Sequence, residues 1–337
     1  MDIDFALAFV LTLAFAVTNG LHDASNAIAL PVATRALRPG QAIVLATVFN
    51  LLGPVLAGAA VADTIGGIVM VGSPQSAIEV IGAGVAAAVA WNLVTFWRGL
   101  PSSSGHALVG GLVGAALVEG GIHAVEWGGF HGWRPVGVLG TLVALAVSPL
   151  PGALAALLIV RGLRRAARRA TRRWSLPVRG GQWTASAALA FSHGSNDAQK
   201  AVGVAAALLV ADGRLSSLSG PTWLELACAA ALTAGTALGG WRIIRTVGRR
   251  IYRIRSIDGL AGETGASGVI LGASFLGAPV STTQVVASSV VGLGAGRRRW
   301  HHVRWAIVRQ MGLAWAVTLP ATAALAAVLF ELWSGLS

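Results

Sequence analysis

The chain has 337 residues, of which 55% are hydrophobic and only 11% are charged, and its formal net charge is +12. So low a charged fraction excludes an ordinary soluble globular domain and indicates a polytopic membrane protein, since soluble domains carry about 25% charged residues. The one cysteine, Cys228, excludes an internal disulfide and a metal site built from several cysteines.

Arginine residues gather in four parts of the sequence, at 35–38, 161–179, 242–255 and 297–309, and the stretches between these clusters contain few arginines. Arg and Lys stay on the cytoplasmic side of membrane proteins, so we predict that all four clusters are cytoplasmic. The pattern favours a multi-pass protein of the plasma (inner) membrane over a nucleic-acid-binding protein. It also predicts that both termini lie outside the cytoplasm.

The first half of the chain begins with an apolar run at 3–38, which is predicted to cross inward and which contains a polar motif in its middle. Residues 40–62 return outward. The next run, from 77 to 118, is interrupted by Pro-Ser-Ser-Ser-Gly-His at 101–106, which we interpret as the tip of a re-entrant hairpin. A last run at 135–160 crosses inward and is predicted to bend near Pro149 and Pro151.

The second half repeats this plan from the other side. Helices are predicted at 183–210 and 222–241, followed by a hairpin over 258–296 and a final helix at 303–332. The tip of that hairpin is Pro-Val-Ser-Thr-Thr-Gln at 279–284. The sequence therefore predicts an all-α polytopic membrane protein with two inverted repeats and re-entrant helical hairpins, a secondary-transporter architecture. The halves are 1–160 and 182–337, joined by a basic cytoplasmic linker at 161–181.

Two polar motifs, at 19–26 and 193–200, lie inside apolar runs, where ionisable residues are costly and usually line a water-filled cavity. Asp23 and Asn26 are three residues apart and share a helix face, as do Asp197 and Lys200, the only lysine. The repeat should bring these four side chains together. Gly20 and Gly194, just before them, would allow the helix backbone to open. The alternative interpretation is a pair of helix N-caps with aspartate as the capping residue.

The two hairpin tips predict a different chemistry. Each tip carries hydroxyl side chains just before a helix, and helix N-termini bind anions. Two facing tips would replace the hydration shell of a tetrahedral oxyanion. The alternative is ordinary capping by serine and threonine after a proline turn. The residues are Ser102, Ser103, Ser104, Ser281, Thr282 and Thr283.

Together, the segments at 19–26, 101–106, 193–200 and 279–284 resemble the signature segments of the inorganic phosphate transporter (PiT) family. The resemblance implies a carrier of inorganic phosphate and not an enzyme, with no cofactor and no bound structural metal. It implies that phosphate is held by Ser103, Ser104, Ser281, Thr282 and Thr283. The coupling-cation region would comprise Asp23, Asn26, Asn196 and Asp197.

Two positions depart from the family pattern. Sodium-coupled members typically carry asparagine where this chain has Lys200, and an ammonium group cannot coordinate sodium. We therefore predict proton symport, in which Asp23 and Asp197 exchange a proton and Lys200 supplies a fixed positive charge. A static ion pair between Lys200 and an aspartate is the alternative. Gln284 stands where the family often has histidine, and His106 keeps the other copy.

Other functions remain open at this point. Sulfate is also a tetrahedral oxyanion, but it lacks the proton with which phosphate can donate a hydrogen bond to Asp23 or Asp197. Two intramembrane aspartates can also form the dyad of an aspartyl protease, although the expected Gly-x-Gly-Asp surroundings are missing. Contact of the basic linker with anionic lipid, the proton-to-phosphate ratio and assembly into a homo-oligomer are left open.

Overall fold

The computed structural model describes residues 3–131, 134–169, 175–239, 243–244, 246–252, 254–297 and 299–335, and most of these residues are helical. Within these ranges, six helical stretches are long and apolar enough to cross a membrane. The prediction of an all-α polytopic membrane protein is confirmed. A pair of two-residue antiparallel strands, β1 (Phe130–His131) and β2 (Arg134–Pro135), lies in the loop before α6.

The first half contains a long helix that carries the polar motif at 19–26, a re-entrant hairpin and a final helix that is broken into two. The hairpin consists of α4 and α5, with its tip at 99–103, and the final helix is divided at Ser148 into α6 and α7, beside the predicted prolines. The elements are α1 (Ile3–Ala33), α2 (Pro39–Ala57), α3 (Ala60–Gly66), α4 (Pro74–Arg98), α5 (Ser104–Gly120), η1 (Gly121–Ala124), α6 (Gly137–Val147), α7 (Pro149–Ala166) and η2 (Ala167–Arg169).

The second half contains elements in the same order, with α11 and α12 as its hairpin and a tip at 276–281. Its final helix, α13, is continuous although it contains Pro320. The elements are α8 (Ser175–Ala211), α9 (Thr222–Leu238), the π-helical turn η4 (Thr246–Arg250), α11 (Ser256–Phe275), α12 (Thr282–Gly296), η5 (Trp300–His302) and α13 (Trp305–Ser334).

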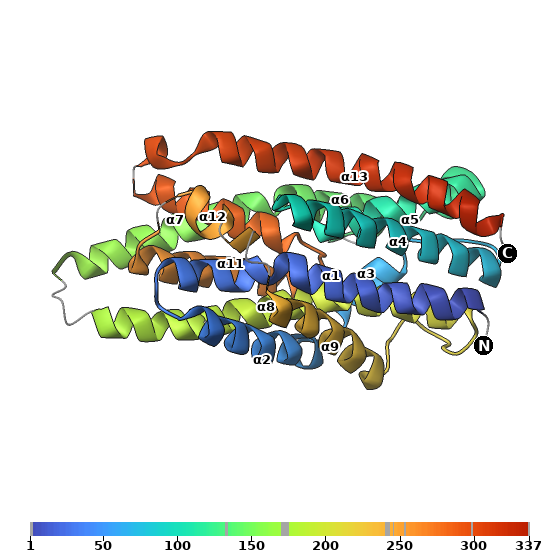
Figure 1. Ribbon diagram of the computed structural model, residues 1–337, viewed down its shortest axis with the longest axis horizontal. Coiled ribbons are helices and arrows are strands. Elements are labelled where there is room, and N and C mark those ends of the chain that lie inside the picture. The colour runs from blue at the N-terminus through green and yellow to red at the C-terminus, as the bar shows by residue number, and fades with distance from the viewer. Residues whose placement is uncertain are drawn as a thin grey trace.

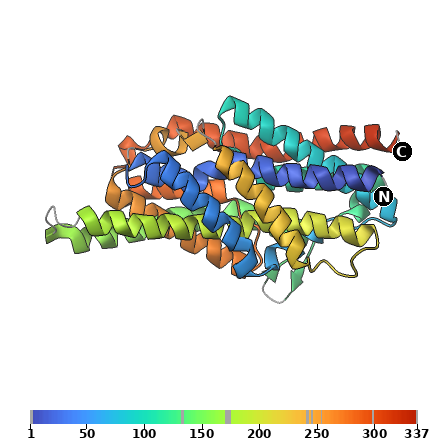
Figure 2. The same ribbon diagram turned by 60° about the horizontal axis from the view of Figure 1, so that its bottom comes forward.

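Both termini lie at one end of the elongated molecule, and the connections α1–α2, α7–α8 and α12–α13 lie at the other end (Figures 1 and 2). We call this second end the basic end, because those connections and the helix ends that flank them carry Arg35, Arg38 and the described arginines of 161–179 and 297–309. Helices α1 and α8 run in opposite directions, and the two hairpins start from opposite ends. Arg172, Arg173, Arg242, Arg245, Arg253 and Arg298 of the predicted clusters lie outside the described residues.

Glycines let helices of one half approach helices of the other half closely, and they do so reciprocally. A Cβ on Gly20 of α1 would lie 1.9 Å from the carbonyl oxygen of Leu232 on α9. A Cβ on Gly194 of α8 would lie 2.3 Å from the carbonyl oxygen of Asn50 on α2. Real Cβ atoms do not approach so closely, so only glycine allows this α1–α9 and α2–α8 packing. Such reciprocity is what an internal duplication predicts.

The polar motifs lie between two apolar clusters. One cluster contains α1 up to Ala16 and α8 from Ala201 onward, together with α4 and α5. The other contains α1 from Ala24 onward and α8 up to Ala190, together with α11 and α12. The segments 18–23 and 192–200 are therefore held midway along the molecule, where both hairpin tips end.

Two sequence-based expectations were wrong. Helices α1 and α8 continue through Gly20 and Gly194, so the backbone does not open there, and Asp23 and Asp197 are mid-helix residues and not N-caps. Close packing explains the glycines instead. Within the predicted basic linker at 161–181, α7 and η2 extend to Arg169 and α8 begins at Ser175. Residues 170–174 lie outside the described residues.

Candidate functional site

Asp23 of α1 connects both hairpin tips. Its Oδ2 accepts a hydrogen bond from Ser104 Oγ at 3.0 Å, and its Oδ1 accepts one from Thr283 Oγ1 at 2.8 Å. Ser104 is the first residue of α5 and Thr283 lies in the first turn of α12. Asp23 is only 2% exposed. The carboxylate therefore lies between the N-termini of two helices that come from opposite ends of the molecule.

Asn26 binds the second tip from the next turn of α1. Its Nδ2 donates to Thr282 Oγ1 at 3.1 Å and to Thr283 Oγ1 at 3.0 Å. Asn26 Oδ1 accepts a long hydrogen bond, 3.4 Å, from Ser25 Oγ. Asp23 and Asn26 thus hold the hydroxyl groups of α12 from one helix face, as their three-residue spacing predicts.

Asp197 of α8 is the counterpart of Asp23 and is 1% exposed. Its Oδ2 accepts a hydrogen bond from Thr282 Oγ1 at 2.7 Å and lies 3.0 Å from His193 Nε2. Lys200 Nζ forms an ion pair with Oδ1 of Asp197 and donates to the carbonyl oxygen of Val280 at 2.8 Å. Lys200 therefore connects the carboxylate of α8 directly to the backbone of the second tip.

Asn196 of α8 contacts the same tip. Its Nδ2 donates to Ser274 Oγ at 3.1 Å and to the carbonyl oxygen of Ala278 at 3.2 Å, whereas its Oδ1 has no partner among the described residues. The amide nitrogen of Asn196 therefore positions the second tip, whereas its oxygen is buried without a described partner.

Ser103 and Ser281 cap the two tip helices. Ser103 Oγ accepts a hydrogen bond from the backbone N–H of His106 at 3.2 Å, and Ser281 Oγ accepts one from that of Gln284 at 3.3 Å. The alternative interpretation as ordinary caps is correct for these two serines. Each hydroxyl accepts in its cap, so its own O–H group stays available to donate to a bound anion.

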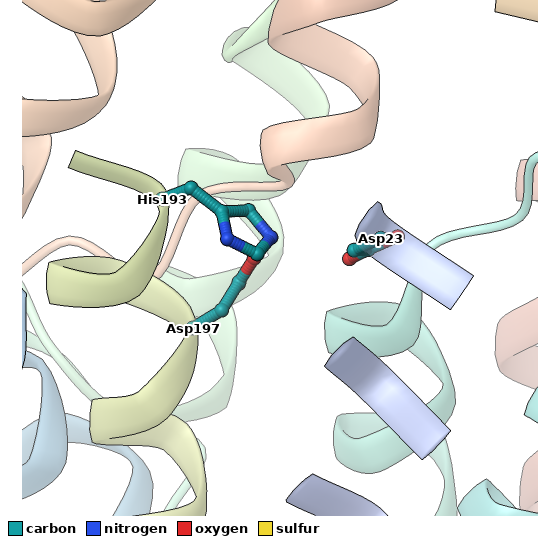
Figure 3. A group of neighbouring side chains, drawn as sticks. All are labelled: Asp23, His193 and Asp197. Atoms are coloured by element: carbon teal, nitrogen blue, oxygen red, sulfur yellow. The ribbon is translucent and has the colours of Figure 1, made fainter. Parts of the chain in front are cut away.

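Asp23, His193 and Asp197 form a small cluster in which α1 faces α8 (Figure 3). One ligand atom from each of the three side chains lies within 4.8 Å of the other two, and all three residues are buried. With the histidines neutral, two carboxylates and the Lys200 ammonium give the centre one net negative charge. Such a centre attracts a cation or a proton.

Histidines support the two aspartates in different ways. His22 Nδ1 lies 3.1 Å from Asp23 Oδ1, and its Nε2 lies 3.2 Å from both Thr95 Oγ1 and Ser102 Oγ. His193 Nδ1 lies 3.1 Å from Asn50 Oδ1. His106 of α5 has no partner for its Nδ1 among the described residues.

Sequence reasoning missed several polar residues that complete the site. Asn50 Nδ2 donates to Thr236 Oγ1 at 3.1 Å, which extends the His193 network from α2 to α9. Ser274 of α11 and Thr95 of α4 support Asn196 and His22. Polar residues inside these apolar helices were the available signal, but nothing in the sequence indicated that these particular residues meet.

Comparisons with known proteins agree with this geometry. Residues 19–326 match the model of a group described as the phosphate transporter family. The chain is 37% identical over 326 residues to a probable low-affinity inorganic phosphate transporter of Bacillus subtilis, a match that covers 96% of this chain and 95% of that protein. A protein of the same name from Rhizobium meliloti is 39% identical over 339 residues, covering 97% and 98%.

One solved structure has the same fold along its whole length. Its title is "The sodium-dependent phosphate transporter", and it matches with a TM-score of 0.87 and 23% sequence identity, covering 100% of both chains. At this level of identity the likeness shows the fold. It gives no information about which cation this chain uses.

Proposed function

Because the chain belongs to the phosphate transporter family, we propose that it imports inorganic phosphate in symport with protons. Transport proceeds by alternating access of two inverted halves, 1–160 and 182–337, about the site between the hairpin tips. The chain is a multi-pass membrane transporter and not an enzyme, so the protease alternative is excluded. The relatives reported above are named for phosphate, which leaves the sulfate alternative without support.

The proposed phosphate ligands are the hydroxyl groups of both tips, which lie at the N-termini of α5 and α12. The helix dipoles and the unpaired N–H groups of those first turns favour an anion. Thr283 and Ser104 donate to Asp23 in the structure, and phosphate binding would redirect these O–H groups to the anion. The full set is Ser103, Ser104, Ser281, Thr282 and Thr283.

Lys200 is the observation that carries the proton assignment. Its ammonium group forms an ion pair with one carboxylate oxygen of Asp197, and the Lys200 side chain is only 1% exposed. A fixed positive charge therefore occupies the place beside Asp197 that a metal cation would need. The centre has one net negative charge, and each negative charge on an entering phosphate makes it more negative. Protons on Asp23, Asp197 or the phosphate itself cancel this charge, and uncompensated charge is costly in a membrane interior. Asp23, Asn26, Asn196, Asp197 and Lys200 form the proposed coupling region.

We place the basic end in the cytoplasm of a cell with this protein in its plasma (inner) membrane, on the strength of the arginine distribution. Both termini then lie outside. In this orientation an inside-negative membrane potential opposes phosphate uptake, and every accompanying proton contributes about 2.3 kcal/mol per 100 mV toward overcoming it.

Uptake of labelled phosphate into proteoliposomes tests the proposal. We expect an inward proton gradient to drive accumulation without sodium, and Lys200→Asn to make uptake respond to a sodium gradient. Accumulation that requires sodium in the unaltered protein would refute proton coupling. Competition with unlabelled sulfate and unlabelled phosphate in the same assay checks the substrate, and equal inhibition by sulfate would contradict the phosphate assignment.

A further inference from the structure

A single side chain of α8, Gln199, binds the backbone on both sides of the break between α2 and α3. Its Oε1 accepts a hydrogen bond from the backbone N–H of Val61 at 3.0 Å, and its Nε2 donates to the carbonyl oxygen of Gly58. Inside a membrane the backbone groups freed by a helix break need such partners. Gln199 is 2% exposed and directly precedes Lys200 in the second polar motif. The motif therefore also fixes the start of α3.

Glycines pack α3 tightly against α8. A Cβ on Gly203 of α8 would lie 2.3 Å from the carbonyl oxygen of Ala62, and a Cβ on Gly66 would lie 2.9 Å from the carbonyl oxygen of Gly203. Ala62 and Ile65 belong to the apolar cluster that contains α1 up to Ala16. Helix α3 is therefore anchored in the part of the molecule nearest the termini.

Helix α3 also binds the second hairpin tip. Thr64 Oγ1 donates to the carbonyl oxygen of Gly277 at 2.8 Å, and it has a second acceptor on its own helix, the carbonyl oxygen of Ala60, at 3.2 Å. The hydroxyl group keeps this second acceptor when the tip moves away. Opening the contact therefore leaves no unpaired donor on α3, which makes it a contact that can break and form again.

Three carbonyl oxygens of the second tip are held at the same time. Gly277 accepts from α3, Ala278 accepts from Asn196, and Val280 accepts from Lys200. A cavity of about 480 Å³ is lined by the same tip residues and by the end of α6. Since close-packed interiors resist displacement, this cavity gives the tip room to move that a packed neighbour would not allow.

Resting on the proposed alternating access, we propose that α3 is a latch that closes the transport site toward the termini. The Thr64 hydroxyl holds the second tip in the closed position, and the site opens toward the termini only when this tip leaves α3. Gln199 is a positioning residue, because it fixes the start of α3 and acts through that helix. With the termini outside, the latch controls the entry of phosphate.

A reversible cross-link between α3 and the tip tests whether the two must separate. A Cβ on Gly277 would lie 3.4 Å from the Cβ of Ala60, close to the separation of about 3.8 Å within a disulfide. In a Cys228→Ala background, oxidised Ala60→Cys/Gly277→Cys should lose phosphate–phosphate counterflow at least tenfold. Reduction should restore it to the level of Gly277→Cys alone. That single variant is the matched control, because Gly277 has a φ of 68° that strains any other residue.

Thr64→Val tests the hydrogen bond without a cross-link and keeps the shape of the side chain. Loss of one hydrogen bond that favours the closed position should lower the external phosphate KM by about three- to sixfold, with the maximal rate within about twofold. A purely structural role would lower the maximal rate instead. Thr264→Val, on the exposed face of α11, is the control and should leave the KM unchanged.

Full counterflow by the oxidised double-cysteine protein would overturn the latch, and so would an unchanged KM in Thr64→Val. Counterflow at equal pH needs no ion gradient, so it tests the latch independently of proton coupling. If the unaltered protein shows counterflow but no proton-driven uptake, proton symport fails and the latch still stands or falls with the cross-link.

Discussion

Replacing Lys200 by asparagine should destabilise the protein by a calculable amount. The change removes the positive charge paired with Asp197 and the donor 2.8 Å from the Val280 carbonyl oxygen. Both partners of the pair are at most 1% exposed, and breaking such a buried pair costs about 3–5 kcal/mol. The asparagine amide recovers about 1 kcal/mol through a new hydrogen bond. We therefore expect the free energy of unfolding to fall by about 2–4 kcal/mol.

The double variant Asp197→Asn/Lys200→Asn separates the ion pair from other effects. Asp197→Asn alone leaves the ammonium buried without its charge partner and should cost a similar amount to Lys200→Asn alone. The double variant removes both charges, so it should cost clearly less than the sum of the single variants. Denaturant unfolding of the four purified proteins in one detergent measures this difference. If the two single costs add up to that of the double variant, the ion pair does not stabilise the fold and the reasoning is refuted.

Three further predictions concern the central site and its packing. Asp23→Asn should lower proton-driven phosphate uptake more than tenfold, because the amide cannot exchange the proton. Thr283→Val removes the donor 2.8 Å from Asp23 and should raise the phosphate KM severalfold in uptake assays. Gly194→Ala would place a Cβ 2.3 Å from the carbonyl oxygen of Asn50 and should lower the free energy of unfolding by about 1–3 kcal/mol.

Each of these variants has a matched control on the same kind of element. Asp63→Asn changes an exposed aspartate and should leave uptake unchanged. Thr264→Val changes an exposed threonine of α11 and should leave the phosphate KM unchanged. Gly180→Ala lies on α8 with nothing within 4 Å and should be neutral or slightly stabilising. A loss in the control as large as in its partner would contradict the specific contact invoked.

The sequence predicts that the polar motifs and the hairpin tips meet, because each motif by itself requires polar partners inside an apolar run. Asp23 and Asp197 lie in apolar runs, where ionisable side chains need polar partners, and the hydroxyl-bearing tips supply them. The break at Ser148 could be predicted because Pro149 and Pro151 remove backbone donors. In both cases the local residue type limits the structure before any tertiary contact forms.

Other features depended on contacts between distant residues and left no local signal. Gly20 and Gly194 are compatible with an opened helix and with close packing, and only the partners Leu232 and Asn50 decide for packing. The contact between Ser186 of α8 and the buried carboxyl group of Glu263 on α11 also left no local signal, because the two residues are 77 positions apart.

The two halves provide similar frames but different chemistry at equivalent positions. Asn26 corresponds to Lys200, since both lie three residues after an aspartate, yet Asn26 donates to the hydroxyl groups of α12 whereas Lys200 donates to a tip carbonyl. The second tip is thus held from both α1 and α8. The first tip is held from α1 by Asp23 and His22, and from α13 by Trp315 Nε1, which donates to the Pro101 carbonyl oxygen at 2.9 Å. Protonation of either aspartate therefore changes the contacts of the second tip, because Thr283 donates to Asp23 and Thr282 donates to Asp197. Under the proposed proton coupling, this asymmetry would tie proton binding most directly to the hairpin that starts from the basic end.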